Sequence, residues 1–347
     1  MKLMKTTEAV GQVLCHDITQ IIPGVKKDAV FRKGHIITKE DIPVLLSVGK
    51  DTIYIWENDD TMMHENEAAQ VLYSMCACGT ASKMHPSSVK EGKIEVIADC
   101  DGLLKVDSEK LKKVNSFGEM MIATRHGNTT VKKDDKLAGT RIIPLVIKKD
   151  KLEAASHICD DGPILDIKPF VIRKAAIITT GNEVYHGRIQ DAFTPVIEKK
   201  IAEFGAQMMF HEVFDDDDKK ITDGCLRAIE AGAEIVFCTG GMSVDPDDKT
   251  PLAIKNTGAR IVSYGSPVLP GAMFLLSYYD AGDRLVPICG LPGCAMYNKR
   301  TIFDIVLPRL MARDMILADE LAGLGEGGLC LNCDVCTFPN CGFGKGF

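Results

Sequence analysis

No apolar run in this sequence approaches the roughly 18 residues that a membrane-spanning helix needs, so no membrane segment is expected. Residues 1–7, MKLMKTT, lack the apolar core of a secretory signal, which predicts a cytoplasmic protein. The net charge is −7, so no overall positive field attracts nucleic acid or an anionic membrane. A binding site for an anion must therefore be built locally.

Cysteine, by contrast, is abundant and unevenly spread. The chain has 13 cysteines in 347 residues, and four of them lie within the last 18 residues. In a reducing cytoplasm, this favours metal ligation or free thiols over a disulfide framework. The hydrophobic content of 46% is ordinary for a folded protein with a sizeable core, and the length predicts two or three domains of about 100–200 residues each.

Residues 1–170 predict a mixed, β-rich N-terminal region. Short apolar segments separated by turn residues indicate strands at 53–56, 94–98, 103–106, 120–124 and 141–147, and helices at 38–48, 65–75 and 108–114. The polar segment 124–128 is interpreted as a solvated hairpin loop. Cys76 and Cys78 are interpreted as structural thiols, because two cysteines without others nearby make a poor metal site.

From residue 171 strands and helices alternate, which predicts βαβ units in a three-layer α/β domain with a mainly parallel sheet over residues 171–315. The predicted strands are 175–178, 208–213, 235–238, 261–263, 272–277 and 285–289, and the predicted helices include 194–205, 250–256 and 296–311. The acidic run 215–218 begins a further helix and is interpreted as its solvated cap, because acidic residues favour a helix N-terminus.

The sequence is organised around residues 237–248, FCTGGMSVDPDD. A buried strand leads into Gly240 and Gly241, a serine and three carboxylates. In an open α/β sheet, ligands bind beyond the carboxyl ends of the strands, and glycines let backbone N–H groups approach an anion. A divalent cation between anion and carboxylates would remove their repulsion, which indicates a phosphate or oxyanion site that works with Mg²⁺. The alternative is a sharp turn that caps the next helix.

Two further glycine-bearing loops, 180–183 and 290–293, also follow predicted strands, so we expect all three loops at one sheet edge. None of the three matches the dinucleotide-binding G-x-G-x-x-G pattern or a Walker A loop, and no G-K-[ST] occurs in the chain. An ordinary nicotinamide or P-loop site is therefore not favoured.

Residues 316–347 are predicted to form a linker and a cysteine-rich tail. The tail contains Cys330, Cys333, Cys336 and Cys341 within twelve residues. Four such thiols suit one tetrahedral Zn²⁺ or an Fe–S cluster, and spacing alone does not separate the two. The first three resemble the C-x2-C-x2-C run of bacterial ferredoxins, whereas the fourth departs from the usual x3-Cys-Pro. The alternative is a disordered tail on a flexible linker at 323–328.

The loop sequences TGNE (180–183), TGGMSV with a carboxylate at 248, LPG (269–271) and GLPG (290–293) together resemble the molybdopterin-binding domain of the MoaB/Mog type. That domain is shared by the molybdenum-cofactor biosynthesis proteins that adenylylate molybdopterin and insert molybdate, including the molybdopterin molybdenumtransferase (MoeA/gephyrin) family. The resemblance covers about residues 171–312. The β-rich N-terminal region is similar in plan to the molybdate-inserting branch.

The resemblance implies a set of site residues. Those implied to cradle the phosphate and pterin are Gly181, Gly240, Gly241, Ser243, Gly290, Pro292 and Gly293, and those implied to hold Mg²⁺ and act in catalysis are Glu183 and Asp248. The implied reaction is a Mg²⁺-assisted release of AMP from adenylylated molybdopterin with molybdate captured by the dithiolene. A homodimer and a molybdoenzyme acceptor are implied with it.

Several positions depart from the family pattern. Ala272 stands where the family has lysine, Cys294 and Ala295 stand where it has Asn-Pro, and Asp245 stands where it has glycine. The Ser-Ala-Met-Asp-Gly-Tyr segment of the transferases does not occur in residues 1–170. These departures affect catalysis more than binding. A second hypothesis therefore stays open, in which the protein is a non-catalytic molybdopterin carrier, chaperone or sensor with a zinc or Fe–S tail.

Overall fold

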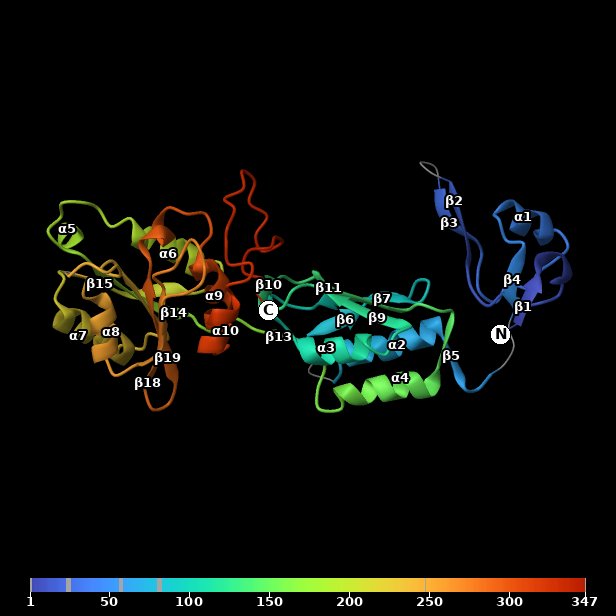
Figure 1. Ribbon diagram of the computed structural model, residues 1–347, viewed down its shortest axis with the longest axis horizontal. Helices are drawn as coiled ribbons and strands as arrows, with labels where there is room; N and C mark the ends of the chain where they lie inside the picture. The colour runs from blue at the N-terminus through green and yellow to red at the C-terminus, as the bar shows by residue number, and fades with distance from the viewer. Residues whose placement is uncertain (1, 23–25, 56–58, 80–82, 247, 347) are drawn as a thin grey trace. The chain divides into compact units, whose positions relative to one another are not determined.

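The computed structural model describes residues 2–22, 26–55, 59–79, 83–246 and 248–346 (Figure 1). The chain divides into two compact units. Unit 1 consists of residues 1–99, 106–125 and 134–166, and unit 2 consists of residues 100–105, 126–133 and 167–347. The three-part division at residues 170 and 315 stays a prediction. No helix within the described ranges has the length and apolar character needed to cross a membrane.

The first part of unit 1 packs short elements around a small apolar core. Strand β1 (Lys2–Lys5) pairs with β4 (Thr52–Ile55), β2 (Ile18–Ile22) pairs with β3 (Lys26–Phe31), and η1 (Thr6–Glu8) and α1 (Asp41–Ser47) complete the set. Leu14, Ile37 and Leu45 lie in its core. The helix predicted over 38–48 is thus confirmed as α1, and the strand predicted over 53–56 is confirmed as β4. Trp56, the last residue of that predicted strand, lies outside the described residues.

The rest of unit 1 contains a four-stranded antiparallel sheet, three α-helices and a 3₁₀ helix among its described residues. The sheet order is β6 (Met84–Pro86), β7 (Lys93–Ala98), β11 (Lys136–Ile142) and β9 (Met120–Thr124), accompanied by α2 (Glu65–Cys76), α3 (Ser108–Asn115), α4 (Lys149–Ser156) and η2 (His157–Cys159). Alternate residues of β7, Ile94, Val96 and Ala98, are buried, as a sheet with one core-facing side requires. Cys76 is buried, and burial raises the pKa of its thiol to about 12, which fits a structural role.

Two sequence predictions in this part of the chain were wrong. The strand expected over 141–147 is interrupted after Ile142, and a separate strand β12 (Val146–Lys148) pairs with β5 (Met62–His64). Pro144 lies in the break, where its missing N–H favours an interruption of the ladder. Segment 124–128 is a loop but no hairpin, because β9 pairs with β11 whereas β10 (Thr129–Val131) pairs with β8 (Gly102–Val106).

Unit 2 is built on a mixed six-stranded sheet. Its order is β15 (Gln207–Phe214), β14 (Lys174–Thr180), β16 (Ile235–Thr239), β19 (Leu285–Leu291), β18 (Leu275–Asp280) and β17 (Arg260–Tyr264). The first four strands are parallel, and β18 and β17 run antiparallel to their neighbours. The parallel arrangement expected of the βαβ units therefore holds for four strands, and the edge that ends in β17 is antiparallel.

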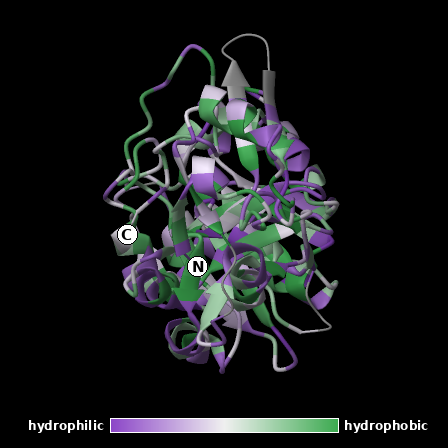
Figure 2. Cartoon of the chain, turned by 90° about the vertical axis from the view of Figure 1, so that its right-hand side faces the viewer, coloured by the Kyte–Doolittle hydropathy of each residue, from purple (hydrophilic) through white to green (hydrophobic). Residues whose placement is uncertain are grey.

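Helices cover both faces of this sheet (Figure 1). Ala175 and Ile177 of β14 face α6 (Phe193–Ala202) and α9 (Ile302–Met311), whereas Ala176 and Ile178 face α7 (Asp218–Glu230) and α8 (Thr250–Asn256). The alternation follows from the two-residue period of a strand, and burial on both faces explains why β14 is apolar throughout. Figure 2 colours the chain by hydropathy and shows both hydrophobic and hydrophilic residues in its strands and helices.

Helix α9 begins at Ile302, not at residue 296 as predicted. Residues Gly293–Met296 form a 3₁₀ turn, η3, and the helix starts where Thr301 and Asp304 make a capping box. Such a box satisfies free N–H groups of the first turn and so fixes the start of the helix. The remaining elements of unit 2 are α5 (Asn182–Tyr185), α10 (Ala318–Gly323) and β13 (Leu165–Lys168), the last of which joins β8 and β10 in a small sheet.

A buried ion cluster joins distant segments of unit 2. The Asp314 carboxylate lies 2.8 Å from Lys105 Nζ, 2.6 Å from Lys168 Nζ and 2.6 Å from Arg309 Nε. Burial alone would raise the pKa of Asp314, but hydrogen bonds from Lys105 and Lys168 and the charge of Arg309 lower it to about 2. Residues 105 and 168 are thereby fastened to the C-terminal part of the sheet domain.

We expect Asp314→Asn to lower the free energy of unfolding by about 2 kcal/mol at pH 7, because a carboxylate whose pKa is depressed on folding stabilises the folded state. This contribution is present above the unfolded pKa near 4 and is lost as the pH falls toward about 2. Urea unfolding of both proteins between pH 7 and pH 2.5 measures it. Asp283→Asn, which removes an exposed carboxylate that pairs with Arg284, is the matched control. A pH-independent difference between wild type and Asp314→Asn would contradict the assignment.

Candidate functional site

The three glycine-bearing loops leave one edge of the sheet of unit 2. Strands β14, β16 and β19 are adjacent and parallel, with Thr179 opposite Thr239 and Thr239 opposite Leu291. The loops 180–183, 240–248 and 290–293 therefore begin side by side, and the topological part of the prediction is confirmed. The ligand roles of their residues stay predictions.

The glycine pair after β16 packs tightly against its neighbours. Gly240 and Gly241 have φ values of +84° and +53°, which favour glycine. A Cβ on Gly240 would lie 2.1 Å from the Thr180 carbonyl oxygen, and a Cβ on Gly241 would lie 2.9 Å from Thr250 Oγ1. These glycines are thus required by close packing of the loop on β14 and α8, whether or not they also contact a ligand.

Two threonine hydroxyls fasten this loop. Thr180 Oγ1 donates to the Thr239 carbonyl oxygen at 3.1 Å, Thr250 Oγ1 donates to the Gly240 carbonyl oxygen at 2.9 Å, and the two hydroxyl oxygens lie 3.0 Å apart. All these groups are buried or nearly so. The path of the loop is therefore set by internal hydrogen bonds.

The loop after β19 divides into a buried and an exposed part. Gly290 and Pro292 are buried, and a Cβ on Gly290 would lie 2.5 Å from the Met242 side chain. Gly293 is exposed, and a Cβ added there would meet no described heavy atom within 4 Å. Gly293 is therefore the predicted site residue of this loop that is open to a ligand. In the other two loops, Ser243 is exposed and Gly181 is half-buried.

The two predicted catalytic carboxylates differ in their surroundings. Glu183 is exposed in the short helix α5. Asp248 is half-buried, and its carboxylate accepts the Asp245 backbone N–H at 3.3 Å, which closes the end of the loop. Burial and the negative charge of Asp248 raise the pKa of Tyr264, whose hydroxyl donates to the Met242 carbonyl oxygen at 2.9 Å. Asp248 thus has a structural contact in addition to its predicted role.

The acidic run before α7 brings further carboxylates to the same edge. Asp217 caps the helix as predicted, because its side chain accepts the Lys219 and Lys220 backbone N–H groups. Asp216, however, accepts the backbone N–H of Asn182 at 3.1 Å, and one oxygen of Asp215 is buried without a hydrogen-bond partner among the described residues. The interpretation of the whole run as a solvated cap therefore missed Asp216. The register that sets Thr180 opposite Phe214 explains its position.

A second polar network lies where β14 and β15 meet α6. The Asp191 carboxylate accepts Thr179 Oγ1 at 2.9 Å and Thr194 Oγ1 at 2.6 Å, and His211 Nε2 lies 3.1 Å from Thr179 Oγ1. Burial would raise the pKa of Asp191, but the bonds from Thr194, Thr179 and Phe193 lower it overall. The helix predicted over 194–205 begins at Phe193, and Asp191 just before it accepts the backbone N–H groups of Phe193 and Thr194.

All four tail cysteines line one cavity of about 230 Å³. Lys299, Arg300 and Phe338 line it as well, and the Arg300 guanidinium lies 5.0 Å from the centre of the Phe338 ring. A backbone N–H bond from Phe338, together with Arg300, lowers the pKa of the Cys336 thiol. Across the described residues, no three His, Cys, Asp or Glu side chains converge closely enough to hold a single metal ion.

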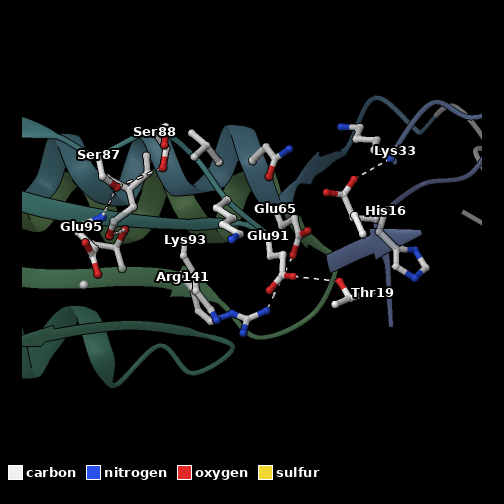
Figure 3. Close-up of a pocket in the computed structure, with 18 of the residues that line it drawn as sticks. His16, Thr19, Lys33, Glu65, Ser87, Ser88, Glu91, Lys93, Glu95 and Arg141 are labelled. Atoms are coloured by element: carbon white, nitrogen blue, oxygen red, sulfur yellow. Dashed lines mark hydrogen bonds and ion pairs between the residues drawn. The ribbon is translucent and has the colours of Figure 1, made fainter. Parts of the chain in front are cut away.

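Unit 1 contains a polar groove of about 920 Å³ that was not predicted from the sequence (Figure 3). Glu65, Glu91 and Arg141 gather in it, and the Glu91 carboxylate accepts Thr19 Oγ1 at 3.1 Å. Burial is the main cause that raises the pKa of Glu65, which lies against Gly92 and 4.0 Å from Arg141. Its lining has both signs of charge and indicates no single ligand class.

Comparison with known proteins identifies two segments. Residues 176–312 match the family described as "Probable molybdopterin binding domain", and residues 3–57 match a "Domain of unknown function (DUF8806)". The match to the molybdopterin-binding description covers less than half of the chain. The match includes all three edge loops.

Among curated relatives, the "Putative competence-damage inducible protein" of Bacillus velezensis is 29% identical over 90 residues, which are 26% of this chain and 21% of that protein. The protein of the same name in Geobacillus sp. is 33% identical over 88 residues, 25% of this chain and 20% of that protein. The chain thus spans about a fifth of the length of these relatives. The tungsten cofactor synthesizing protein MoaB from Pyrococcus furiosus is a similar solved structure, with a TM-score of 0.31 at 18% identity over 41% of this chain and 89% of that one.

We expect Gly240→Ala to destabilise unit 2 by about 2–4 kcal/mol, because the new Cβ overlaps the Thr180 carbonyl and the positive φ strains alanine. Gly293→Ala is the matched control, since its Cβ would enter open space. Denaturant unfolding of the two full-length variants measures the difference. Equal stabilities would show that the loop relaxes freely and is not fixed by Thr180.

Proposed function

We propose that unit 2 binds molybdopterin in its adenylylated form and promotes the Mg²⁺-dependent insertion of molybdate. The observation that carries the proposal is the shared edge: three glycine-bearing loops of a molybdopterin-binding-type domain leave adjacent parallel strands. Ligands of open α/β sheets bind at the carboxyl ends of the strands. A MoeA/gephyrin-type activity, a homodimer and delivery to a molybdoenzyme are parts of the same proposal.

The exposed members of the edge are the ones we assign to the ligand. Ser243 and Gly293 are exposed, and the half-buried Gly181 has no close neighbour where a Cβ would lie. Gly240 and Gly241 are also half-buried but pack closely against Thr180 and Thr250, and Gly290 and Pro292 are buried. Backbone N–H groups at Gly181 and Gly293 and the Ser243 hydroxyl are donors that suit phosphate oxygens. The closely packed Gly240, Gly241 and Gly290 then act by holding these donors in place.

The donor set at this edge suits Mg²⁺. Glu183 and Asp248 offer carboxylate oxygens from two of the loops, and Mg²⁺ is usually held by one or two carboxylates together with substrate phosphates. Asp216, which follows β15, accepts the backbone N–H of Asn182, the residue before Glu183. When bound, the metal supplies charge neutralisation at the leaving phosphate and a template for molybdate. The carboxylates of the chain orient it and the loops position the anhydride bond.

A second candidate function is binding without turnover, as a carrier, chaperone or sensor. Two features favour it. Ala272 is exposed where the resembled family has lysine, and Asp245 adds an exposed carboxylate beside Asp248. Both changes lower the positive potential available to a developing anion, which reduces catalysis more than ground-state binding.

Turnover with adenylylated molybdopterin, Mg²⁺ and molybdate tests the proposal. We expect AMP release that depends on Mg²⁺, and we expect Asp248→Asn to lower kcat/KM at least about 10-fold, or about 1.4 kcal/mol. Asparagine keeps the acceptor that binds the Asp245 N–H, so the variant removes charge without opening the loop. Asp283→Asn, a surface carboxylate outside the edge, should leave AMP release unchanged.

The two candidate functions separate in this experiment. Tight binding of the adenylylated ligand without AMP release would eliminate the transferase and leave the carrier. If the full-length protein fails to bind molybdopterin, with or without the adenylyl group, both are wrong.

A further inference from the structure

The cysteine-rich tail is a packed part of unit 2. The Leu269 N–H donates to the Gly328 carbonyl oxygen and the Cys330 N–H donates to the Leu269 carbonyl oxygen, both at 2.8 Å. At the other end, Phe343 is buried in the core and a Cβ on Gly344 would lie 2.8 Å from the Ile305 side chain. The disordered tail on a flexible linker, considered from the sequence, is therefore not the arrangement found.

Between these two anchors, the four thiols surround a space and do not meet at a point. Cys330 and Cys341 are half-buried, Cys333 and Cys336 are exposed, and all four line the cavity of about 230 Å³. A structural zinc site needs four sulfurs about 2.3 Å from one ion. The cavity is far larger than the roughly 10–15 Å³ that one water-sized probe occupies. In the described chain no three ligating side chains converge on one ion. The described thiols therefore do not form a single-ion site as they stand, and the space that they line has room for a larger group.

We propose that Cys330, Cys333, Cys336 and Cys341 bind one [4Fe–4S] cluster in this cavity. The C-x2-C-x2-C spacing supplies three thiolates from an irregular segment, and Cys341, two residues before the buried Phe343, supplies the fourth. The site lies outside the edge loops, so it stands independently of the proposed function.

Basic residues compensate the charge that such a cluster brings. Four thiolate ligands must be deprotonated to bind iron, which concentrates negative charge in the cavity. Lys299 and Arg300 both line it. Lys299 Nζ donates to the Asp334 carbonyl oxygen at 3.2 Å, and Arg300 Nη1 lies 2.9 Å from Asp304 while its guanidinium stacks on Phe338. Both cations are thus held in place against the tail that carries the thiols.

The cavity and the candidate ligand edge share one stretch of chain. Residues 290–293 form the edge loop, η3 follows, and Lys299 and Arg300 come next. The cluster would therefore lie directly beyond the segment that ends the loop after β19. This connection gives the tail a place in the domain without assigning it a catalytic step.

Anaerobic purification of the full-length chain, expressed with added iron and cysteine, tests the proposal. We expect about 4 iron atoms and about 4 acid-labile sulfides per chain, and a broad visible absorption that dithionite bleaches. One zinc per chain without sulfide would overturn the cluster in favour of a mononuclear site. A chain that holds neither iron nor zinc after anaerobic reconstitution with iron and sulfide would overturn metal binding altogether. The same holds if its tail thiols are then found as disulfides.

Single substitutions locate the ligands. Cys333→Ser and Cys341→Ser should each lose most of the iron and sulfide, whereas Cys78→Ser, an exposed cysteine of unit 1, should retain them. Circular dichroism of each variant reports whether the chain is still folded. A folded Cys333→Ser and a folded Cys341→Ser that both keep full iron and sulfide would assign any cluster to other cysteines and contradict the site.

Discussion

The close approach of Gly240 to the Thr180 carbonyl is the constraint on which the candidate site depends. It joins the end of β16 to the end of β14, and the threonine hydroxyls of residues 180 and 250 hold the joint. Because β19 lies beside β16 in parallel register, the third loop begins at the same edge. Gly240 and Gly241, which first suggest ligand contact, thus serve to pack the loop against its neighbours. The exposed Ser243 and Gly293 remain accessible to a ligand.

The sequence predicted the parallel part of the sheet well because burial on both faces leaves a clear pattern. Residues 175–178 and 235–238 are apolar at every position, and the stripes Ile197–Ile201 and Ile221–Cys225 mark helices that cover opposite faces. The antiparallel edge was not predicted, because an apolar strand looks the same in either direction. The start of α9 was missed because the capping box at Thr301 lies behind an apparently helical stretch.

The site was predicted in outline and missed in detail for a similar reason. Four consecutive aspartates before a helix all resemble a cap, and only the register of β15 against β14 shows that Asp216 turns toward Asn182. Likewise, the spacing of the tail cysteines predicted four ligands but did not distinguish one zinc ion from an Fe–S cluster. That question depends on how far apart the folded chain holds the thiols, and the contact of Cys330 with Leu269, 61 residues earlier in the sequence, cannot be seen in the spacing of the cysteines.

The ion cluster at Asp314 has a consequence for synthesis on the ribosome. Lys105 and Asp314 are 209 residues apart, so at about 5–20 residues per second the lysine waits roughly 10–40 s for its partner. During that interval strands β8 and β10 have been synthesised, but most of the rest of unit 2 has not. A fragment that begins at residue 171 would lack both strands. Unit 2 is therefore one compact unit built from three separate segments of the sequence.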